Sequence, residues 1–226
     1  MSPLIEQPVN IAVVDYGMGN RRSVEKALEH IGARASVTSD HARLRAAAGL
    51  VVPGVGSFPR AMDNLRELGL DELLRERVAS GVPTLGVCLG LQLAFDSSTE
   101  HGGARGLGIV AGEVLRLQVG SLKLPHIGWN EVCFQRSSSP LLSDIPLRCA
   151  FYHVHSFAPS PAREQDVLGI AEYGEPFASA VESGSFYGVQ FHPEKSSAAG
   201  LRLLANFARI CIDAPALSGA GAHAPR

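Results

Sequence analysis

The stretch from Pro83 to Gln92 restricts the fold of this chain more than any other part of its sequence. Its first half is apolar and predicts a short buried strand, and the residues after Cys88 predict the start of a helix. Gly86 and Gly90 stand two residues before and two residues after Cys88. This is the spacing of a nucleophile elbow, a tight strand-to-helix turn, with sulfur in place of oxygen. Glycine suits both flanks because the turn residue is strained and neighbouring Cβ atoms would collide.

An elbow would place the Cys88 thiol at a helix N-terminus, where unpaired N–H groups and the helix dipole favour an anion. A free thiol titrates near about 8.5, and such a position favours a thiolate at neutral pH. The backbone N–H of Leu89 would point to the place where an oxyanion forms. The alternative is that Cys88 is a small buried hydrophobe, which is the interpretation we adopt for Cys133, Cys149 and Cys211. The elbow therefore predicts a catalytic cysteine only if the sequence also supplies a base for the thiol.

A base is offered by the segment after the apolar run at residues 186–190. Pro193 pushes His192 into an extended conformation, in which side chains two residues apart face the same way. His192 and Glu194 then project together, so that Glu194 can orient the imidazole while His192 takes the thiol proton. We therefore predict a triad of Cys88, His192 and Glu194. Without Cys88, a surface pair in a turn would be the preferred interpretation.

The first part of the chain alternates apolar strands with amphipathic helices. We expect strands at residues 10–15, 33–38, 49–52 and 83–87, and helices at residues 22–31, 41–48, 58–68 and 71–80. This alternation predicts an α/β fold with a parallel sheet covered on both faces. In such sheets the loops at the carboxyl ends of the strands build the site.

The second part has short runs bounded by Pro, Gly and Ser, which predict an antiparallel or mixed extension of the sheet. We expect strands at residues 110–117, 123–125, 131–134, 148–154, 167–173, 177–181 and 188–190, and loops at residues 97–106 and 162–166. A helix at residues 199–212 should pack on the sheet. The prediction is a single domain over residues 1–213, followed by a flexible Ala/Gly/Pro-rich tail at residues 214–226.

Two glycine-rich segments follow expected strands. Gly54, Val55 and Gly56 come after the third strand and should lie beside the elbow. They are candidates for the second half of an oxyanion hole, against the alternative of a plain β-turn. Residues 17–20 lack the full G-x-G-x-x-G pattern, with Arg22 at the third glycine position, so we reject nucleotide binding there.

Composition and charge argue against several other classes of protein. A net charge of −2 gives no basic surface for nucleic acid. The sequence shows no signal peptide and no apolar stretch of membrane-spanning length. The four cysteines form no C-x-x-C pair, so neither a zinc site nor a disulfide framework is indicated, and a reducing cytoplasm suits a working thiol. His126, His153 and His155 lack Cys or acidic partners at ligand spacing, so we expect core or polar histidines, no metal and no cofactor.

Six stretches of the chain form a distinctive set when they are read together. They are VDYGMGN at residues 14–20, PGVGSF at 53–58, GVCLGLQ at 86–92, PHIGWN at 125–130, FYHVHS at 151–156 and GVQFHPEKS at 188–196. In this order they resemble the class I, triad-type glutamine amidotransferases, and within that class the glutaminase subunits of imidazole glycerol phosphate synthases of histidine biosynthesis. No single stretch is decisive, but the set spans most of the chain and is highly specific.

The resemblance implies a three-layer flavodoxin-like fold and hydrolysis of the L-glutamine side-chain amide to glutamate and ammonia. It implies that Gln92 and the backbone near Ser156 and Phe157 hold the substrate, and that residues 53–56 reorient to become competent. The family often has tyrosine where Phe157 stands. A contact through the tyrosine hydroxyl would be lost here, whereas a backbone contact would survive.

Because ammonia is protonated and lost in bulk water, a free glutaminase would be wasteful. The resemblance implies a (β/α)8-barrel cyclase as partner, in a heterodimer that channels ammonia to imidazole glycerol phosphate and aminoimidazole carboxamide ribotide. Asn20, Trp129, Tyr152 and Lys195 are implied at the interface; for Trp129 the alternative is a core aromatic.

Two other functions stay open at this point. One is a glutaminase serving another synthase, such as the one that makes pyridoxal phosphate, although the stretches at residues 15–20 and 125–130 argue against it. The other is a non-catalytic flavodoxin-like binding module with a vestigial triad, against which the intact triad argues.

Overall fold

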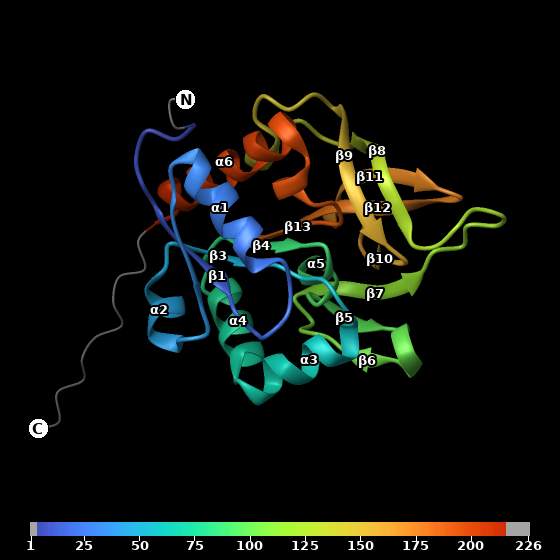
Figure 1. The fold of residues 1–226 in the computed structure, drawn as a ribbon, viewed down its shortest axis with the longest axis horizontal. Helices are drawn as coiled ribbons and strands as arrows, with labels where there is room; N and C mark the ends of the chain where they lie inside the picture. Colours follow the sequence, from blue (N-terminus) through green and yellow to red (C-terminus); the bar gives the residue numbers. More distant parts are fainter. Residues whose placement is uncertain (1–3, 216–226) are drawn as a thin grey trace, which may run out of the picture.

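The computed structural model describes residues 4–215, which form a nine-stranded sheet, a four-stranded sheet and flanking helices (Figure 1). The large sheet has the order β2-β1-β3-β4-β13-β12-β11-β8-β9. Pairs from β2 to β13 are parallel, and the remaining pairs are antiparallel. Its strands are β1 (Asn10–Val14), β2 (Arg34–Thr38), β3 (Gly49–Val52), β4 (Thr84–Val87), β8 (His126–Phe134), β9 (Arg148–His155), β11 (Val167–Tyr173), β12 (Glu175–Ser183) and β13 (Phe186–Val189).

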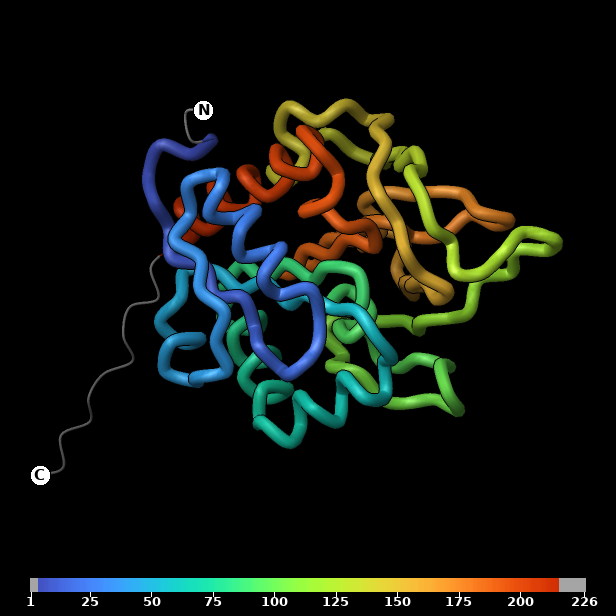
Figure 2. Tube along the Cα trace, viewed as in Figure 1, coloured from blue at the N-terminus to red at the C-terminus, as the bar shows by residue number. Residues whose placement is uncertain are grey.

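Helices cover both faces of the parallel half. The helices are α1 (Arg21–Ile31), α2 (His41–Ala46), α3 (Phe58–Glu67), α4 (Leu70–Ala79), α5 (Leu89–Gln92) and α6 (Ser197–Asp213). Successive strand residues face opposite layers, so Ile11 and Val13 pack with α1 and α6, whereas Ala12 and Val14 pack with α3 and α4. Figure 2 shows α1 and α6 side by side although they come from opposite ends of the chain. The predicted three-layer α/β architecture with an antiparallel extension is confirmed.

The second sheet is the main departure from the predicted elements. Its order is β10-β7-β5-β6, and its strands are β5 (Phe95–Ser98), β6 (Ala104–Arg105), β7 (Val110–Arg116) and β10 (Phe157–Pro161). The prediction of a loop at residues 97–106 was wrong, because part of this segment forms strands and pairs with the distant strand β7. The strand β10 was missed because Pro159 and Pro161 suggest a break. Both prolines are tolerated since β10 lies at the edge of the sheet.

Smaller differences concern the ends of elements and the burial of cysteines. The expected strand at residues 123–125 does not form, because pairing with β9 begins only at His126. Residues 162–166 contain a short 3-10 turn, η3 (Glu164–Asp166). Cys133 and Cys149 are only half-buried on the outer pair β8–β9, so their assignment to the core was wrong, whereas Cys211 is buried. The predicted tail at residues 214–226 lies outside the described residues apart from Ala214 and Pro215.

Three histidines form a polar layer in the core of the antiparallel extension. His153 donates from Nδ1 to the Phe151 carbonyl oxygen at 3.0 Å, which leaves Nε2 to accept from the Ser179 hydroxyl at 2.9 Å. His155 likewise uses Nδ1 for the Phe157 carbonyl oxygen, and its Nε2 lies 3.1 Å from Nδ1 of His126. Burial lowers the pKa of His153 and of His155 to about 3, so both rings are neutral.

None of the helices in the described range is long and apolar enough to span a membrane.

The glycines that frame Cys88 are required by close backbone packing. A Cβ atom on Gly90 would lie 1.8 Å from the carbonyl oxygen of Val52 in β3, and one on Gly86 would lie 2.7 Å from the Gly90 carbonyl oxygen. The short helix α5 therefore sits directly on the neighbouring strand. This contact explains why the sequence allows no side chain at either position.

We expect Gly90→Ala to destabilise the fold by at least about 3 kcal/mol, because the obstructing atom belongs to a central strand and cannot move aside. Gly81→Ala is the control: it has a positive φ of 83° and open space around it, so it should cost only about 1–2 kcal/mol. Urea unfolding of both variants measures the difference. Equal losses would contradict the steric argument.

The histidine layer predicts sensitivity to acid. The folded pKa values lie below the ordinary value of 6.5, so the folded state binds fewer protons than the unfolded state. The corresponding stability is fully present above pH 6.5 and is lost as the pH falls toward about 3, by roughly 2 kcal/mol per buried histidine at pH 5. Urea unfolding at pH 7.5 and pH 5 should show a smaller loss for His153→Gln than for the parent chain. His30→Gln, an exposed control, should behave like the parent.

Candidate active site

Cys88 occupies the turn between β4 and α5 that the sequence predicted. Its backbone has φ 54° and ψ −110°, a region that non-glycine residues rarely adopt, and its side chain is buried beneath the protein surface. The N–H groups of Leu91 and Gln92 donate to the Cys88 carbonyl oxygen and so start the helix. Leu89 is the first helical residue, and its backbone N–H donates to no backbone carbonyl within residues 4–215. An orphan donor thus accompanies the thiol.

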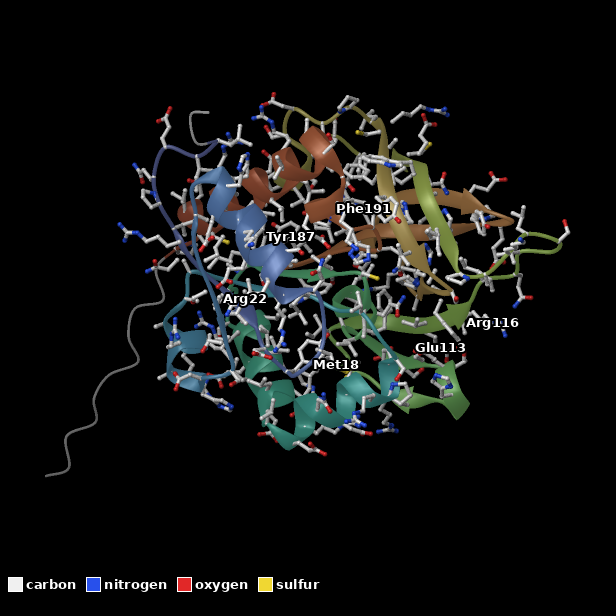
Figure 3. The ribbon with its side chains drawn as sticks, viewed as in Figure 1. Met18, Arg22, Glu113, Arg116, Tyr187 and Phe191 are labelled. Atoms are coloured by element: carbon white, nitrogen blue, oxygen red, sulfur yellow. The ribbon has the colours of Figure 1, made fainter. Side chains whose placement is uncertain are left out.

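His192 reaches the same edge of the sheet because β13 is the parallel neighbour of β4. The Cys88 N–H donates to the carbonyl oxygen of Val189, the last residue of β13, at 2.8 Å. The chain then continues through Phe191, labelled in Figure 3, which stacks on Phe151 of β9 with ring centroids 4.0 Å apart. The His192 N–H donates to the Tyr152 carbonyl oxygen at 2.8 Å. His192 is therefore fixed by β13, which leads into it, and by β9, which lies at the end of the sheet order.

The predicted carboxylate stands behind the histidine. Nδ1 of His192 lies 2.9 Å from Oε1 of Glu194, and both side chains are buried. Burial alone would lower the pKa of His192, but hydrogen bonds and charge interactions with Cys88 and Glu194 outweigh it and raise the pKa well above its ordinary value. The imidazole is thus protonated at neutral pH.

Two further groups fix this triad. Ser196 accepts the Tyr152 N–H at 3.0 Å and donates to the His192 carbonyl oxygen at 2.7 Å, which joins β9 to the histidine segment. Asn20 donates from Nδ2 to Oε1 of Glu194 at 3.4 Å. Oε2 of Glu194 is buried and has no hydrogen-bond partner among the described residues. The Glu194 oxygen that faces the imidazole is therefore the one that makes hydrogen bonds.

A cavity of about 240 Å³ opens beside the Cys88 sulfur. It is lined by predicted site residues and by four that the sequence did not single out: Val55, Gly56, Cys88, Leu89, Gln92, Glu100, Pro125, Val154, His155, Ser156 and Phe157. Gly54 is not part of the lining; it is buried under the elbow, where an added Cβ would lie 2.5 Å from the Leu89 Cβ atom. Of the predicted catalytic, oxyanion and substrate residues, His192 and Glu194 also lie outside the lining, and the others line this one cavity.

Gln92 is held by a buried hydrogen-bond network. Its Nε2 donates to the Phe157 carbonyl oxygen at 2.8 Å and to Oε1 of Gln190 at 3.0 Å, and Nε2 of Gln190 lies 3.6 Å from the Cys88 sulfur. The Phe157 carbonyl oxygen also accepts a hydrogen bond from Nδ1 of His155. Both lone pairs of this oxygen are therefore used within the protein. Sequence reasoning missed Gln190. The available signal was a polar residue in an apolar run two positions before the histidine.

Glu100 was also missed, because a polar glycine-rich stretch is typical of a surface loop. It lies in the 3-10 turn η1 (Glu100–Gly102), and its Oε2 accepts the backbone N–H of Phe58 at 2.7 Å. It is the one acidic residue in the cavity lining. No group of three or more His, Cys, Asp or Glu is arranged to hold a metal ion in the part of the chain that the structure describes.

Two of the predicted interface residues, Trp129 and Tyr152, lie on the β8–β9 pair, whereas Asn20 and Lys195 lie beside the triad, at the start of α1 and in the 3-10 turn η4 (Pro193–Lys195). Trp129 and Tyr152 are paired across the strands, with ring centroids 6.3 Å apart, and Lys195 Nζ lies 6.0 Å from the Tyr152 ring centroid. Trp129 is 56% exposed, so it is not the core aromatic that was the alternative. Ile127 on the same face is 60% exposed.

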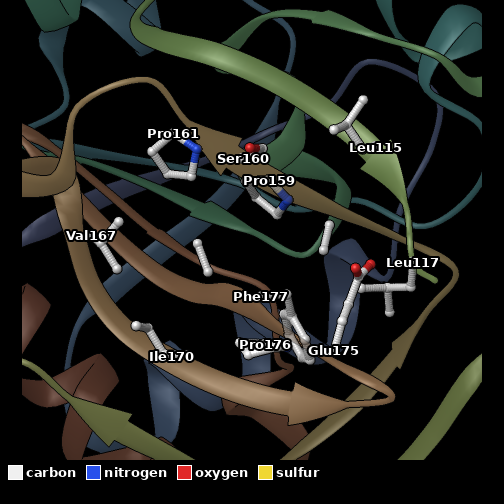
Figure 4. Close-up of a pocket in the computed structure, with 12 residues that line it drawn as sticks. Leu115, Leu117, Pro159, Ser160, Pro161, Val167, Ile170, Glu175, Pro176 and Phe177 are labelled. Carbon is white, nitrogen blue, oxygen red and sulfur yellow. The ribbon is translucent and has the colours of Figure 1, made fainter. Parts of the chain in front are cut away.

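A second cavity, of about 280 Å³, lies away from the triad between β7, β10, β11 and β12 (Figure 4). Its walls are mainly apolar, with Leu115, Leu117 and Phe177 among them. Glu175, its one carboxylate, already accepts the Gln118 N–H at 2.6 Å. It contains no nucleophile and base pair, so the cavity at Cys88 is the candidate active site.

Comparison with known proteins identifies the family and the fold. The family described as glutamine amidotransferase class-I matches residues 12–211. Similar solved structures include PurLQS from Thermotoga maritima, with a TM-score of 0.72 and 17% identity over 91% of this chain and 100% of that chain. Another is the glutaminase domain of Trypanosoma brucei CTPS with bound acivicin, with a TM-score of 0.62 and 20% identity over 89% of this chain and 94% of that chain. At these identities the structures establish the fold.

Curated relatives are much closer in sequence. The imidazole glycerol phosphate synthase subunit HisH of Moorella thermoacetica is 49% identical over 200 residues, which is 88% of this chain and 94% of the relative. The subunit of the same name from Methylococcus capsulatus is 48% identical over 209 residues, 88% of this chain and 96% of the relative. This chain therefore belongs to the class-I glutamine amidotransferases and, within them, to the HisH subunits of imidazole glycerol phosphate synthase.

Proposed function

We propose that Cys88, His192 and Glu194 hydrolyse the side-chain amide of L-glutamine to L-glutamate and ammonia. The observation that carries this proposal is the buried His192–Glu194 pair, with Nδ1 and Oε1 2.9 Å apart, beside a cysteine that lines a cavity. Nucleophile, base and orienting carboxylate then stand in the order that covalent catalysis requires.

In the first half of the reaction, the Cys88 thiolate attacks the carboxamide carbon of glutamine. The Leu89 N–H and the backbone of Gly54, Val55 and Gly56 stabilise the oxyanion, as electrostatic catalysis of acyl transfer requires. The carbon–nitrogen bond breaks as His192 gives its proton to the leaving nitrogen, so ammonia departs and a thioester remains.

In the second half, His192 takes a proton from a water molecule that attacks the thioester carbon. The carbon–sulfur bond breaks, glutamate leaves and the Cys88 thiolate is restored. Glu194 keeps the imidazole oriented throughout, since its Oε1 stays on Nδ1 and leaves Nε2 for the sulfur and the substrate. No cofactor is needed for either half.

The far end of the substrate is held by polar groups of the cavity. We assign Gln92 and the backbone near Ser156 and Phe157 to this role, with the limit that the Phe157 carbonyl oxygen is already occupied. Glu100 is the group with the charge to bind the α-ammonium of an amino acid. The Phe157 side chain carries no hydroxyl, so no contact is assigned to it.

We further propose that the ammonia passes to a (β/α)8-barrel cyclase in a heterodimer. The relatives are named as subunits of imidazole glycerol phosphate synthase. The word subunit implies at least one other chain in the enzyme. The exposed face with Ile127, Trp129, Tyr152 and Lys195 adjoins the triad and offers aromatic anchors for a partner. Asn20 donates to Glu194, so a partner that contacts Asn20 would change the surroundings of that carboxylate. A reducing cytoplasm suits the working thiol that this proposal requires.

The first test is glutamate release from glutamine, measured with and without the cyclase subunit and its nucleotide ligand. We expect low activity alone, strong stimulation by the liganded cyclase and no activity in Cys88→Ala, because the sulfur supplies the covalent intermediate. High activity alone that ignores the cyclase would contradict the partner assignment. Inactivity of the folded chain with a verified cyclase would instead favour a binding module.

A second test concerns substrate binding. Glu100→Gln keeps an oxygen for the Phe58 N–H but loses the charge, so we expect KM for glutamine to rise about 10-fold or more, as for a lost charge-assisted hydrogen bond. The value of kcat should change little, because the α-ammonium lies at the unreactive end. Glu113→Gln, on the exposed side of β7, is the control and should leave KM unchanged. An unchanged KM in Glu100→Gln would remove Glu100 from the site.

A further inference from the structure

Gln190 is a buried polar side chain that the proposed triad chemistry does not use. It is fully buried, directly after β13, and its Nε2 lies 3.6 Å from the Cys88 sulfur. The sulfur also lies 3.8 Å from the Val154 carbonyl oxygen. A thiol can donate to that carbonyl, but a thiolate has no proton to donate and would be repelled by it. The amide of Gln190 is then the group that matches the charged form of the sulfur.

The orientation of this amide follows from the hydrogen-bond network. The Phe157 carbonyl can only accept, so it fixes Nε2 of Gln92 as the facing atom. The second N–H of that group meets Oε1 of Gln190 at 3.0 Å, which requires an acceptor there. Nε2 of Gln190 is therefore the atom directed at the sulfur. A flipped Gln190 would set donor against donor at one end and an oxygen against the thiolate at the other.

We propose that Gln190 is a positioning residue for the nucleophile: it donates an N–H to the Cys88 thiolate and ties that sulfur to Gln92 in the substrate cavity. This role rests on the proposed function of Cys88. The donor stabilises the thiolate before attack and again when the thioester is cleaved. Because no water reaches the buried Gln190, the interaction is not weakened by solvent.

The test is the pH dependence of Cys88 alkylation by iodoacetamide in the full chain, read by mass spectrometry between pH 4 and pH 9. The reagent needs the thiolate but does not need the glutamine site. Gln190→Met has nearly the same shape and no donor, so we expect the midpoint of alkylation to rise by about one pH unit. The acid limb of kcat/KM for glutamine should move in the same direction.

Thr84→Val is the matched control. Thr84 is equally buried on β4 and donates to the Val82 carbonyl oxygen, so its loss weakens the same region without touching the sulfur. We expect a lower unfolding midpoint in urea with no change in the alkylation midpoint. A shift as large as that of Gln190→Met would mean that general loosening, and not the lost donor, moves the midpoint, and would overturn the proposal.

Gln190→Glu keeps the proposal testable if Gln190→Met does not fold. Its carboxylate still accepts from Gln92 but presents an oxygen to the sulfur, so the midpoint should rise further than in Gln190→Met. An unchanged midpoint in either folded variant would overturn the role of Gln190. Equal labelling of Cys88, Cys133 and Cys149 in the parent chain would instead overturn the proposed nucleophile, so the two failures can be told apart.

Discussion

The backbone hydrogen bond from Cys88 to Val189 underlies the whole site. It is the last bond of the parallel ladder between β4 and β13, which are adjacent in space but about a hundred residues apart in the chain. Because parallel strands end at the same edge of a sheet, this pairing brings Cys88 and His192 together. The contact of Gly90 with Val52 adds a third strand and holds the elbow in place. The sheet thus sets the backbone positions of Cys88 and His192, and the side chain of Glu194 orients the imidazole.

Charges are buried at this edge only where they are matched. His192 is protonated because Cys88 and Glu194 outweigh the penalty of removing it from water. A short distance away, His153 and His155 have no carboxylate partner in the described structure, and there burial keeps them neutral. The same residue type is therefore charged beside Cys88 and Glu194 and neutral at two positions in the core. The difference lies in the neighbours and not in the depth of burial.

The antiparallel extension has two faces with different tasks. Its inner face carries His126, His153 and His155 in a polar layer that stacks on Tyr173 and meets Phe177 edge-on, and His155 lines the cavity at Cys88. Its outer face exposes Ile127 and Trp129 in the same strand, because successive residues of a strand point to opposite sides. The backbone of Tyr152 in the paired strand holds His192. A partner bound to the outer face, as proposed, would therefore contact the pair β8–β9, which includes the strand that holds His192.

Local sequence determined much of this protein. The glycine spacing around Cys88, the His192-Pro193-Glu194 segment and the alternation of strands and helices each express a short-range rule of backbone geometry, and the structure has the elbow, the facing pair and the layered sheet that they predict. The tertiary structure alone decided the rest. Glu100 enters the cavity from a stretch with the composition of a loop, Gln190 meets the sulfur through packing, and β5 and β10 form only because β7 lies between them. These features depend on contacts between residues far apart in the chain, and the polar Gln190 within an apolar run is the one local signal that points to any of them.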